Sequence, residues 1–322
     1  MPSRLVAIAI LFFLALVGTA SAQTWPSKPI KLVVPWPAGG SADLIGRVVA
    51  DHLTGVLKQT VVVENRGGAA GMIGSLSVSR ADPDGLTLLV SGIPSHVIAP
   101  ATSPKPEYDG VKDFTHIAYL GGPPIVLAAH TALKVSSLKE LIAAAKTSKE
   151  PIGYVSAGVG SLGHIHAEYL AQREKIKIQH IPYRGGAQAA QDFIAGHVRL
   201  GSMTWSSARA GIQGGQFIPL AVSSSRRQPD FPNIPTFKDL GYDELTTATW
   251  WSISGPPDLP ADIVERLNRE IRAMLKLSSV LGRLATESFE SEDMSPAEFT
   301  RFVQAEIKKW GPVASAVATE KK

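Results

Sequence analysis

Short apolar strands alternate with amphipathic helices along most of this chain. Such alternation predicts right-handed βαβ units around largely parallel sheets, and therefore an α/β fold. Strand character marks residues 30–34, 60–63, 86–90, 117–120, 125–129, 152–155, 176–181, 198–203 and 217–222. Helical periodicity marks residues 41–57, 71–80, 137–146, 164–172 and 187–195, and two further helices after residues 260 and 295.

Two stretches rich in turn residues divide this pattern. Residues 121–124 read Gly-Gly-Pro-Pro, and residues 228–241 hold a second cluster of prolines and glycine. A chain of 322 residues is long enough for two domains. We therefore expect one lobe from residues 23–121 and 240–322 and a second lobe from residues 122–239, with the two crossovers forming a hinge.

The N-terminus has the parts of an export signal. Arg4 precedes an apolar run over residues 5–17, and residues 20–22 give the small-residue pattern that precedes cleavage. A transmembrane anchor is the alternative, but the run is shorter than the roughly 20 residues that a spanning helix needs. We expect a signal peptide over residues 1–22 and a mature protein in the periplasm, where a chain without cysteine relies on its core alone.

Charge and composition exclude several classes of protein. The formal net charge is +4 and the basic residues are dispersed, which argues against a nucleic-acid partner. The absence of cysteine excludes thiolate ligands and thiol catalysis. His164 and His166 are two residues apart on a predicted helix, so they point in different directions and cannot chelate one metal together. We expect neither a metal nor a cofactor, and we interpret His166 as structural.

The loop at residues 35–43 joins a buried strand to a helix. Its two glycines let the backbone approach a ligand closely, and the N–H groups at the helix start favour an anion. Ligands of open α/β sheets bind at the carboxyl ends of strands. Two structural alternatives stay open, because Ser41 could cap the helix and Trp36 could simply be packed. The predicted ligand contacts in this loop are Trp36, Pro37, Ala38, Gly39 and Gly40.

A second strand–loop–helix junction occupies residues 156–164. Two hydroxyls and three glycines converge there on a helix start, an arrangement suited to a carboxylate. The glycines also satisfy G-x-G-x-x-G, but His180 and Pro182 end the next strand where a dinucleotide site needs an acidic residue, so that site is rejected. The predicted contacts are Ser156, Ala157, Gly158, Ser161 and His164.

A third loop of the same kind spans residues 182–187. It contributes Tyr183 and Gly186 to the predicted site, and Arg184 is the only cation in the three loops. Arg184 either pairs with a ligand carboxylate or forms an ordinary salt bridge.

No recognisable catalytic pattern occurs in the sequence. Tyr154 stands two residues before Ser156, so there is no G-x-S-x-G elbow, and H-E-x-x-H, P-loop and EF-hand patterns are missing. We therefore expect a binding protein with no catalytic residues. A secreted hydrolase that uses Ser156 or Ser161 is the alternative, and an adhesive envelope protein without a ligand is a third hypothesis.

An ordered series of short motifs resembles the Bug family of periplasmic receptors, which belong to the tripartite tricarboxylate transporter type. Each motif is weak alone, but their order along the whole mature chain is specific. The motifs are residues 25–30, 33–40, 62–66, 81–88, 112–114, 156–158 with His164, 181–186, 220–222 and 233–236.

The resemblance implies a two-lobed fold of the type II periplasmic-binding-protein kind, in which each lobe is a mostly parallel sheet flanked by helices. Such receptors close on small carboxylates and related molecules and pass them to a membrane permease or, in some members, to a sensor kinase. The first loop is expected to hold one polar end of the ligand through backbone groups and waters, and residues 156–164 to hold the other. We expect a monomer.

Two departures from the family pattern bear on the ligand. Val159 replaces a frequent asparagine, and Met203 falls where members often carry an aspartate that would suit an amino group. The loss of that acid argues against an amino-acid ligand. Because Trp36 and Trp205 also lie near these positions in the sequence, we expect a less polar or aromatic carboxylate, with Met203 among its contacts. Within the ligands that the resemblance implies, an aromatic or a dicarboxylic acid fits this expectation.

Overall fold

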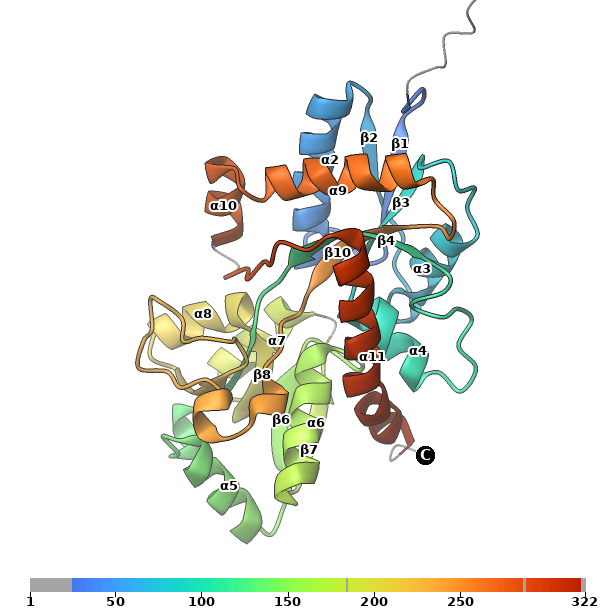
Figure 1. The fold of residues 1–322 in the computed structure, drawn as a ribbon. Helices are drawn as coiled ribbons and strands as arrows, with labels where there is room; N and C mark the ends of the chain where they lie inside the picture. The colour runs from blue at the N-terminus through green and yellow to red at the C-terminus, as the bar shows by residue number, and fades with distance from the viewer. Residues whose placement is uncertain (1–24, 184, 286–287, 320–322) are drawn as a thin grey trace, which may run out of the picture.

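The computed structural model describes residues 25–183, 185–285 and 288–319, so the expected signal peptide lies outside the described residues. Two five-stranded sheets form two lobes, with the first lobe above the second in Figure 1. The strand order is β2-β1-β3-β10-β4 in the first sheet and β7-β6-β8-β5-β9 in the second. Both sheets therefore have the same topology, and the predicted two-lobed α/β fold is confirmed.

The elements follow the chain in two series. The strands of the first sheet are β1 (Ile30–Val34), β2 (Val61–Asn65), β3 (Thr87–Gly92), β4 (Thr115–Gly121) and β10 (Trp251–Gly255). The strands of the second sheet are β5 (Ile125–His130), β6 (Ile152–Ser156), β7 (Ile178–Pro182), β8 (Leu200–Thr204) and β9 (Phe217–Val222). The α-helices are α2 (Ser41–Leu57), α3 (Met72–Ser79), α4 (Ala99–Thr102), α5 (Leu138–Thr147), α6 (Leu162–Glu174), α7 (Gly186–Ile194), α8 (Trp205–Gln213), α9 (Ala261–Met274), α10 (Ser278–Ala285) and α11 (Pro296–Thr319). Short turns of other helix types are η1 (Ala69–Gly71), η2 (Pro94–Ile98), η3 (Thr131–Leu133), η4 (Lys238–Leu240) and η5 (Asp243–Leu245).

Each sheet contains one strand that runs against the others. β1 pairs in parallel with β2 and β3, and β6 pairs in parallel with β7 and β8. β10 and β5 are antiparallel to both of their neighbours. These two strands are the ones by which the chain enters each lobe from the other. The chain leaves β4 at the carboxyl edge of the first sheet and enters β5 at the carboxyl edge of the second, so the two carboxyl edges meet at the crossover.

Three backbone segments lie side by side between the lobes. Gly122 exchanges two backbone hydrogen bonds of 3.1 Å with Glu290, and the Thr249 N–H donates to the Pro123 carbonyl at 2.8 Å. A Cβ on Gly122 would lie 1.9 Å from the Thr249 carbonyl oxygen, so the backbones can approach this closely only at a glycine. The return crossover lies beyond the turn-rich stretch at residues 228–241.

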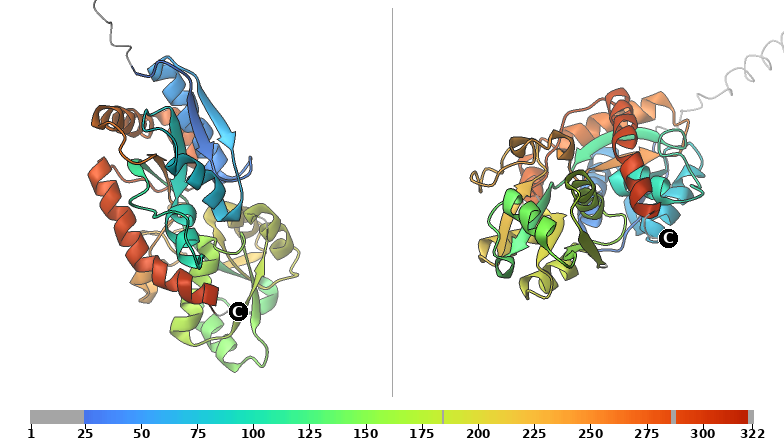
Figure 2. Two further views of the ribbon diagram at one scale, coloured as in Figure 1. Left: turned by 90° about the vertical axis from the view of Figure 1, so that its right-hand side faces the viewer. Right: turned by 90° about the horizontal axis from the view of Figure 1, so that it is seen from below.

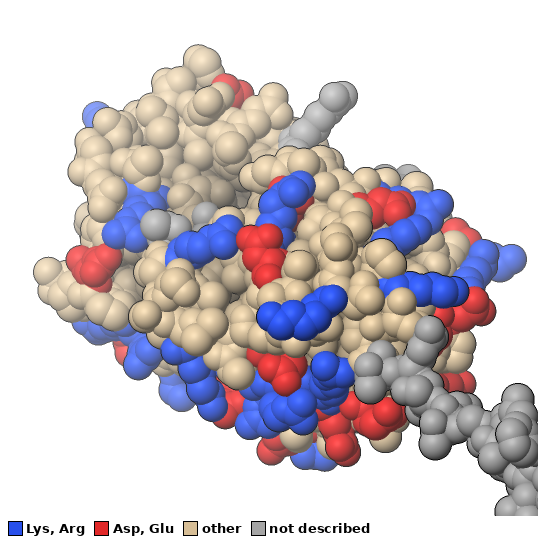
Figure 3. All heavy atoms as spheres, turned by 90° about the horizontal axis from the view of Figure 1, so that it is seen from above, with Lys and Arg blue, Asp and Glu red and all other residues tan. Residues whose placement is uncertain are grey.

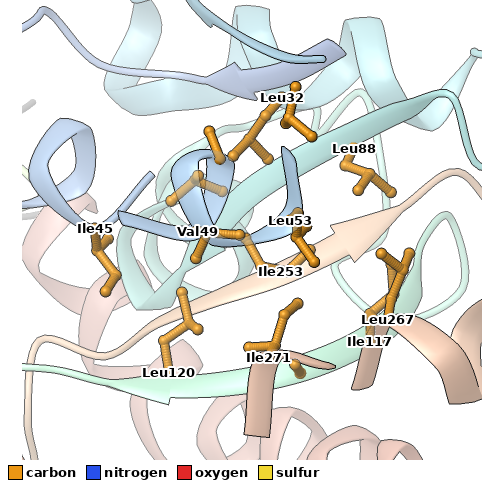
Figure 4. Close-up of a cluster of buried hydrophobic side chains, with 14 of the residues drawn as sticks. Leu32, Ile45, Val49, Leu53, Leu88, Ile117, Leu120, Ile253, Leu267 and Ile271 are labelled. Atoms are coloured by element: carbon orange, nitrogen blue, oxygen red, sulfur yellow. The ribbon is translucent and has the colours of Figure 1, made fainter. Parts of the chain in front are cut away.

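The core of the first lobe lies between its sheet and helices α2 and α9 (Figure 4). On α2 the apolar residues recur every four positions, which places them on one face of the helix. That face is buried against side chains from three strands of the sheet. The α2 residues are Ile45, Val49 and Leu53, and the strand residues include Leu32, Leu88 and Ile253.

Helix α11 runs along both lobes (Figures 1 and 2). It begins with the predicted capping box, in which Ser295 Oγ accepts from the Glu298 N–H and the Glu298 carboxylate accepts from the Ser295 N–H. Near its start, the Phe299 ring packs against rings of β4 in the first lobe. Further along the helix, the centroid of the Trp310 ring lies 6.3 Å from that of His166 and 6.1 Å from that of Tyr169, both on α6 of the second lobe.

Candidate ligand-binding site

The three predicted binding loops all follow strands that end at the two neighbouring carboxyl edges. The loop after β1 leads into α2, the loop after β6 leads into α6, and the loop after β7 leads into α7. The start of a helix carries unpaired N–H groups and the positive end of the helix dipole. The topology therefore brings three helix starts that favour anions to the region between the sheets.

Asp43 holds the first loop from the side of the protein interior. Its buried carboxylate accepts 3.0 Å hydrogen bonds from the Gly39 N–H, from Arg47 Nε and from Asn65 Nδ2. Burial acts to raise the pKa of Asp43, but the hydrogen bonds from Arg47, Gly39 and Asn65 outweigh it and hold the pKa below its ordinary value. Asp43 is therefore ionised at neutral pH.

The outer side of the first loop is open. Residues 37–40 are exposed, and a Cβ on Gly39 or Gly40 would meet nothing within 4 Å. Gly39 has a φ of +91°, which residues with a side chain rarely adopt. Gly40 is the N-cap of α2, with no side-chain hydrogen bond to cap it, so Ser41 is the first helical residue and not the cap.

Trp36 belongs to the first loop, and its ring also packs against other parts of the first lobe. Its ring is half-buried and meets the edge of Trp251 with ring centroids 4.7 Å apart. A Cβ on Gly71 would lie 3.1 Å from the Trp36 ring and 3.4 Å from Ser95 Cβ. The indole therefore packs the first loop against β10 and against Gly71 in the segment that follows β2.

The π-helical turn η2 borders the second loop and is linked to the first loop through Gly71. Ile98 in this turn lies 3.8 Å from where a Cβ on Gly160 of the second loop would be. Ser95 in the same turn lies beside Gly71, whose other neighbour is the Trp36 ring. Single π-helical turns occur often at functional sites. The second loop therefore lies against η2 of the first lobe, and the first loop lies one residue contact away, across Gly71.

Ser156 organises the second loop from within. Its side chain has no exposed surface, and its Oγ lies 2.7 Å from His180 Nε2 and accepts from the Gly158 N–H at 3.1 Å. Ser161 Oγ donates to Ser156 Oγ at 3.2 Å and caps α6 by accepting from the His164 N–H at 3.3 Å. Sequence reasoning missed His180, although a histidine in the strand that pairs with β6 was a signal for it.

His164 lies behind the second loop and not on its surface. Only 1% of it is exposed, and its Nδ1 accepts from the Gly160 N–H at 3.2 Å, which places the ring proton on Nε2. The ring stacks on His180 with centroids 4.0 Å apart. Its Nε2 is 3.9 Å from Glu168 Oε1, which also accepts from the Tyr154 hydroxyl at 2.7 Å.

The third loop touches the second. A Cβ on Gly158 would lie 2.7 Å from the Tyr183 carbonyl oxygen, and a Cβ on Gly186 would lie 2.3 Å from Ser207 Oγ. The Tyr183 hydroxyl donates to Asp192 at 2.7 Å, and burial together with this carboxylate raises the pKa of Tyr183 to about 12. Ser207, at the start of α8, is a neighbour of the loop that sequence reasoning did not single out. Arg184 lies outside the described residues.

Two residues on which the aromatic-ligand argument rested lie in a hydrophobic core. Met203 and Trp205 are each 1% exposed, in a cluster with Val126 and Phe193 of the second lobe. In this conformation neither side chain reaches the surface between the lobes. The preference for an aromatic ligand therefore loses this support.

Among the described residues, no group of three or more histidine, aspartate or glutamate side chains is placed to hold a metal ion. His164 stacks on His180, whereas His166 points elsewhere and meets the Leu245 carbonyl at 3.0 Å. Acidic and basic side chains are interspersed over the face seen in Figure 3. Within the same described ranges, no helix has the length and apolar character needed to cross a membrane.

The fold and the loops together define a class. Two lobes of this topology, joined by crossovers and with helix starts at the facing carboxyl edges, are those of a periplasmic binding protein. The family model described as "Tripartite tricarboxylate transporter family receptor" matches residues 45–318. The chain belongs to this family.

Sequence and structure comparisons agree with this assignment. Protein BugT of Bordetella pertussis is 33% identical over 315 residues, which cover 97% of this chain and 96% of BugT. Rpa4515 of R. palustris, solved with adipate, is 30% identical with a TM-score of 0.80, covering 90% of this chain and 97% of that protein. MatC of Rhodopseudomonas palustris, solved with bound malate, is 28% identical with a TM-score of 0.79, covering 90% and 100%.

Proposed function

We propose that this protein is a periplasmic receptor that binds a small carboxylate, most simply a dicarboxylate, between its two lobes. The observation that carries the proposal is the meeting of the two carboxyl edges, which places the starts of α2, α6 and α7 around one region. Backbone N–H groups at helix starts bind anions without any basic side chain. The start of α2 in the first lobe and the starts of α6 and α7 in the second lobe therefore suit a ligand with two polar ends, one for each lobe.

The chemistry of the relatives supports a dicarboxylate. Two structures similar to this chain over 90% of its length contain adipate and malate, each of which has two carboxylates. The buried positions of Met203 and Trp205 remove the main argument for an aromatic acid. The proposed contacts are the exposed or half-buried loop residues Trp36, Pro37, Ala38, Gly39, Gly40, Ala157, Gly158, Ser161, Tyr183 and Gly186, with Ser156 and His164 acting from behind the second loop.

In this proposal the units that close on the ligand are residues 23–121 with residues 250–322, and residues 122–249, so the boundary expected at residue 240 moves to the crossover at Thr249, because Leu245 and Thr247 hydrogen-bond to the second lobe. The crossovers around Gly122 and Thr249 form the hinge. The liganded receptor, a monomer, would deliver its cargo to a membrane permease or present it to a sensor kinase. A decrease in the radius of gyration on adding ligand, measured by small-angle scattering, would support closure.

Thermal-shift and calorimetric titration with adipate, malate, benzoate and aspartate test the ligand class. A ligand at 100 times its Kd stabilises the folded state by about 2.7 kcal/mol, which is readily seen as a shift in Tm. We expect a dicarboxylate to give the largest shift. Ala38→Glu puts a negative charge on the first loop and should abolish that shift, whereas Ala143→Glu, on the exposed face of α5, is the matched control and should not.

Two results would refute the receptor proposal. One is that no compound shifts Tm and that native mass spectrometry finds no co-purified small molecule. The other is equal ligand binding by the Ala38→Glu and Ala143→Glu variants. Largest stabilisation by benzoate would keep the receptor but refute the dicarboxylate class, and largest stabilisation by aspartate would refute the expectation that the ligand lacks an amino group.

A serine hydrolase is the second candidate, because Ser156 Oγ lies 2.7 Å from His180 Nε2 as a nucleophile and its base would. The complete burial of Ser156 and its hydrogen bond from Gly158 count against that role. We expect no turnover of p-nitrophenyl acetate above that of Ser156→Ala. Turnover that disappears in this variant would establish the hydrolase instead.

A further inference from the structure

The carboxylate of Asp43 binds three donors from three different parts of the first lobe. Gly39 belongs to the first loop, Arg47 lies one turn further along α2, and Asn65 ends β2. All three hydrogen bonds measure 3.0 Å. Asn65 Nδ2 also donates to the Trp36 carbonyl at 3.1 Å, so the same unit reaches the start of the loop.

The exposed part of the first loop is held at a few points, one of which is the close approach of Pro37 to Gly67. Residues 37–40 are exposed, and the space around Gly39 and Gly40 is open. Trp36 anchors one end through Trp251, and α2 anchors the other. Among the described residues, the Gly39 N–H donates a hydrogen bond to Asp43 between these two anchors, and this bond ties the exposed backbone to the start of α2.

The negative charge of Asp43 weakens the attraction of the α2 start for a ligand anion, and Arg47 offsets this effect. A carboxylate in the first turn of α2 uses part of the helix dipole that would otherwise attract a ligand anion. Arg47 Nε is 3.0 Å from Asp43 Oδ2, so the pair is neutral overall and the dipole stays available. An acidic residue at this position can accept from a backbone N–H before the helix simply to cap it, but the hydrogen bond from Asn65 of β2 links Asp43 to a part of the lobe outside the helix start.

We propose that Asp43, together with Asn65 and Arg47, is the positioning unit that keeps the first loop in its ligand-binding shape. This inference rests on the proposed receptor function. Its consequence is that loss of Asp43 reduces ligand affinity far more than the stability of the fold accounts for. Asp43 itself is a positioning residue that acts through Gly39 and does not touch the ligand.

The experiment compares three single variants of the full mature chain with wild type. Asp43→Ala removes the acceptor, and Asn65→Ala keeps the charge but breaks the link to Trp36 and Asp43. Asp51→Ala is the matched control, because Asp51 is on the same helix, has a 74% exposed side chain and pairs only loosely, at 3.7 Å, with Arg283. Hydrogen exchange of the peptide that covers residues 36–44 is measured without ligand, and adipate and malate affinities are measured by calorimetry.

We expect exchange in residues 36–44 to accelerate about tenfold or more in Asp43→Ala, because a charge-assisted hydrogen bond is lost. Affinity for the dicarboxylate that wild type binds should fall by a similar factor, with a smaller effect in Asn65→Ala. Asp51→Ala should match wild type in both measurements. If Asp43→Ala does not fold, Asn65→Ala carries the test.

Distinct results overturn the inference and the proposed function. Wild-type exchange and affinity in Asp43→Ala and Asn65→Ala would overturn the inference alone, as would a lower Tm with unchanged affinity of the folded protein. Suppose instead that wild type binds neither adipate nor malate, but that hydrogen exchange in residues 36–44 accelerates in Asp43→Ala. This result would support the positioning unit and count against the dicarboxylate receptor.

Discussion

Acidification from pH 7 to pH 5 should destabilise the folded chain through three buried histidines. Burial lowers the pKa of His116 and of His166 from 6.5 to about 4, and burial with the nearby His116 places the pKa of His96 well below 6.5. The unfolded chain binds protons at these sites below pH 6.5, but the folded chain does not. Their stabilisation is therefore complete above pH 6.5 and is lost as the pH falls towards 4.

The size of the effect follows from these values. A histidine with a pKa of 6.5 unfolded and about 4 folded loses roughly 2 kcal/mol of stabilisation between pH 7 and pH 5. His116 and His166 together account for about 4 kcal/mol, and His96 acts in the same direction. Burial raises the pKa of Glu290 and Glu306, so these two groups offset part of the loss. A loss of this size is a large share of the roughly 5–15 kcal/mol typical of a folded domain.

Urea unfolding followed by circular dichroism at pH 7, 6 and 5 measures the effect. In His166→Gln the amide can still donate to the Leu245 carbonyl, which His166 Nε2 meets at 3.0 Å, and the group no longer titrates. We expect this variant to lose about 2 kcal/mol of the pH dependence. A free energy of unfolding that is flat from pH 7 to 5, or an unchanged pH dependence in the folded variant, would refute the reasoning.

Two further predictions concern the segments between the lobes. Gly122→Ala should lower the free energy of unfolding by about 3 kcal/mol or more, because its Cβ would lie 1.9 Å from the Thr249 carbonyl oxygen. Gly55→Ala is the control, because a Cβ there would meet nothing within 4 Å. Equal urea midpoints for the two variants would contradict the prediction. Trp250→Phe removes the 2.9 Å hydrogen bond from the indole to the buried Glu306 carboxylate and should cost about 1–3 kcal/mol at pH 7. A midpoint within error of wild type would show that Glu306 finds another partner.

The sequence was sufficient to predict most strands but not the direction of two of them. An apolar run such as residues 125–129 has the same pattern whichever way the strand runs, so the antiparallel placement of β5 was not foreseen. β10 was missed entirely, because Ser252 and Ser254 interrupt its apolar character. Both hydroxyls are buried and lie 2.7 Å from Ser91 Oγ of β3, a pairing that no local pattern encodes.

The positions of the three loops proposed to bind the ligand were predictable, because a glycine-rich turn between a strand and a helix has a local signature. The side chains that support them were not, because each support comes from a distant part of the chain. Asn65 reaches the first loop from β2, and His180 reaches Ser156 from β7. Met203 shows the converse limit, since its place in the sequence near the site says nothing about which face of β8 it occupies.

Helix α11 makes the position of one tryptophan depend on both lobes. Its start is fixed on β4, whereas Trp310 packs on His166 and Tyr169 of α6. A rotation of one lobe relative to the other must therefore slide this contact or bend the helix near Pro312. In a variant that keeps Trp310 and replaces the other five tryptophans, the emission of this residue would therefore report lobe movement without any attached dye.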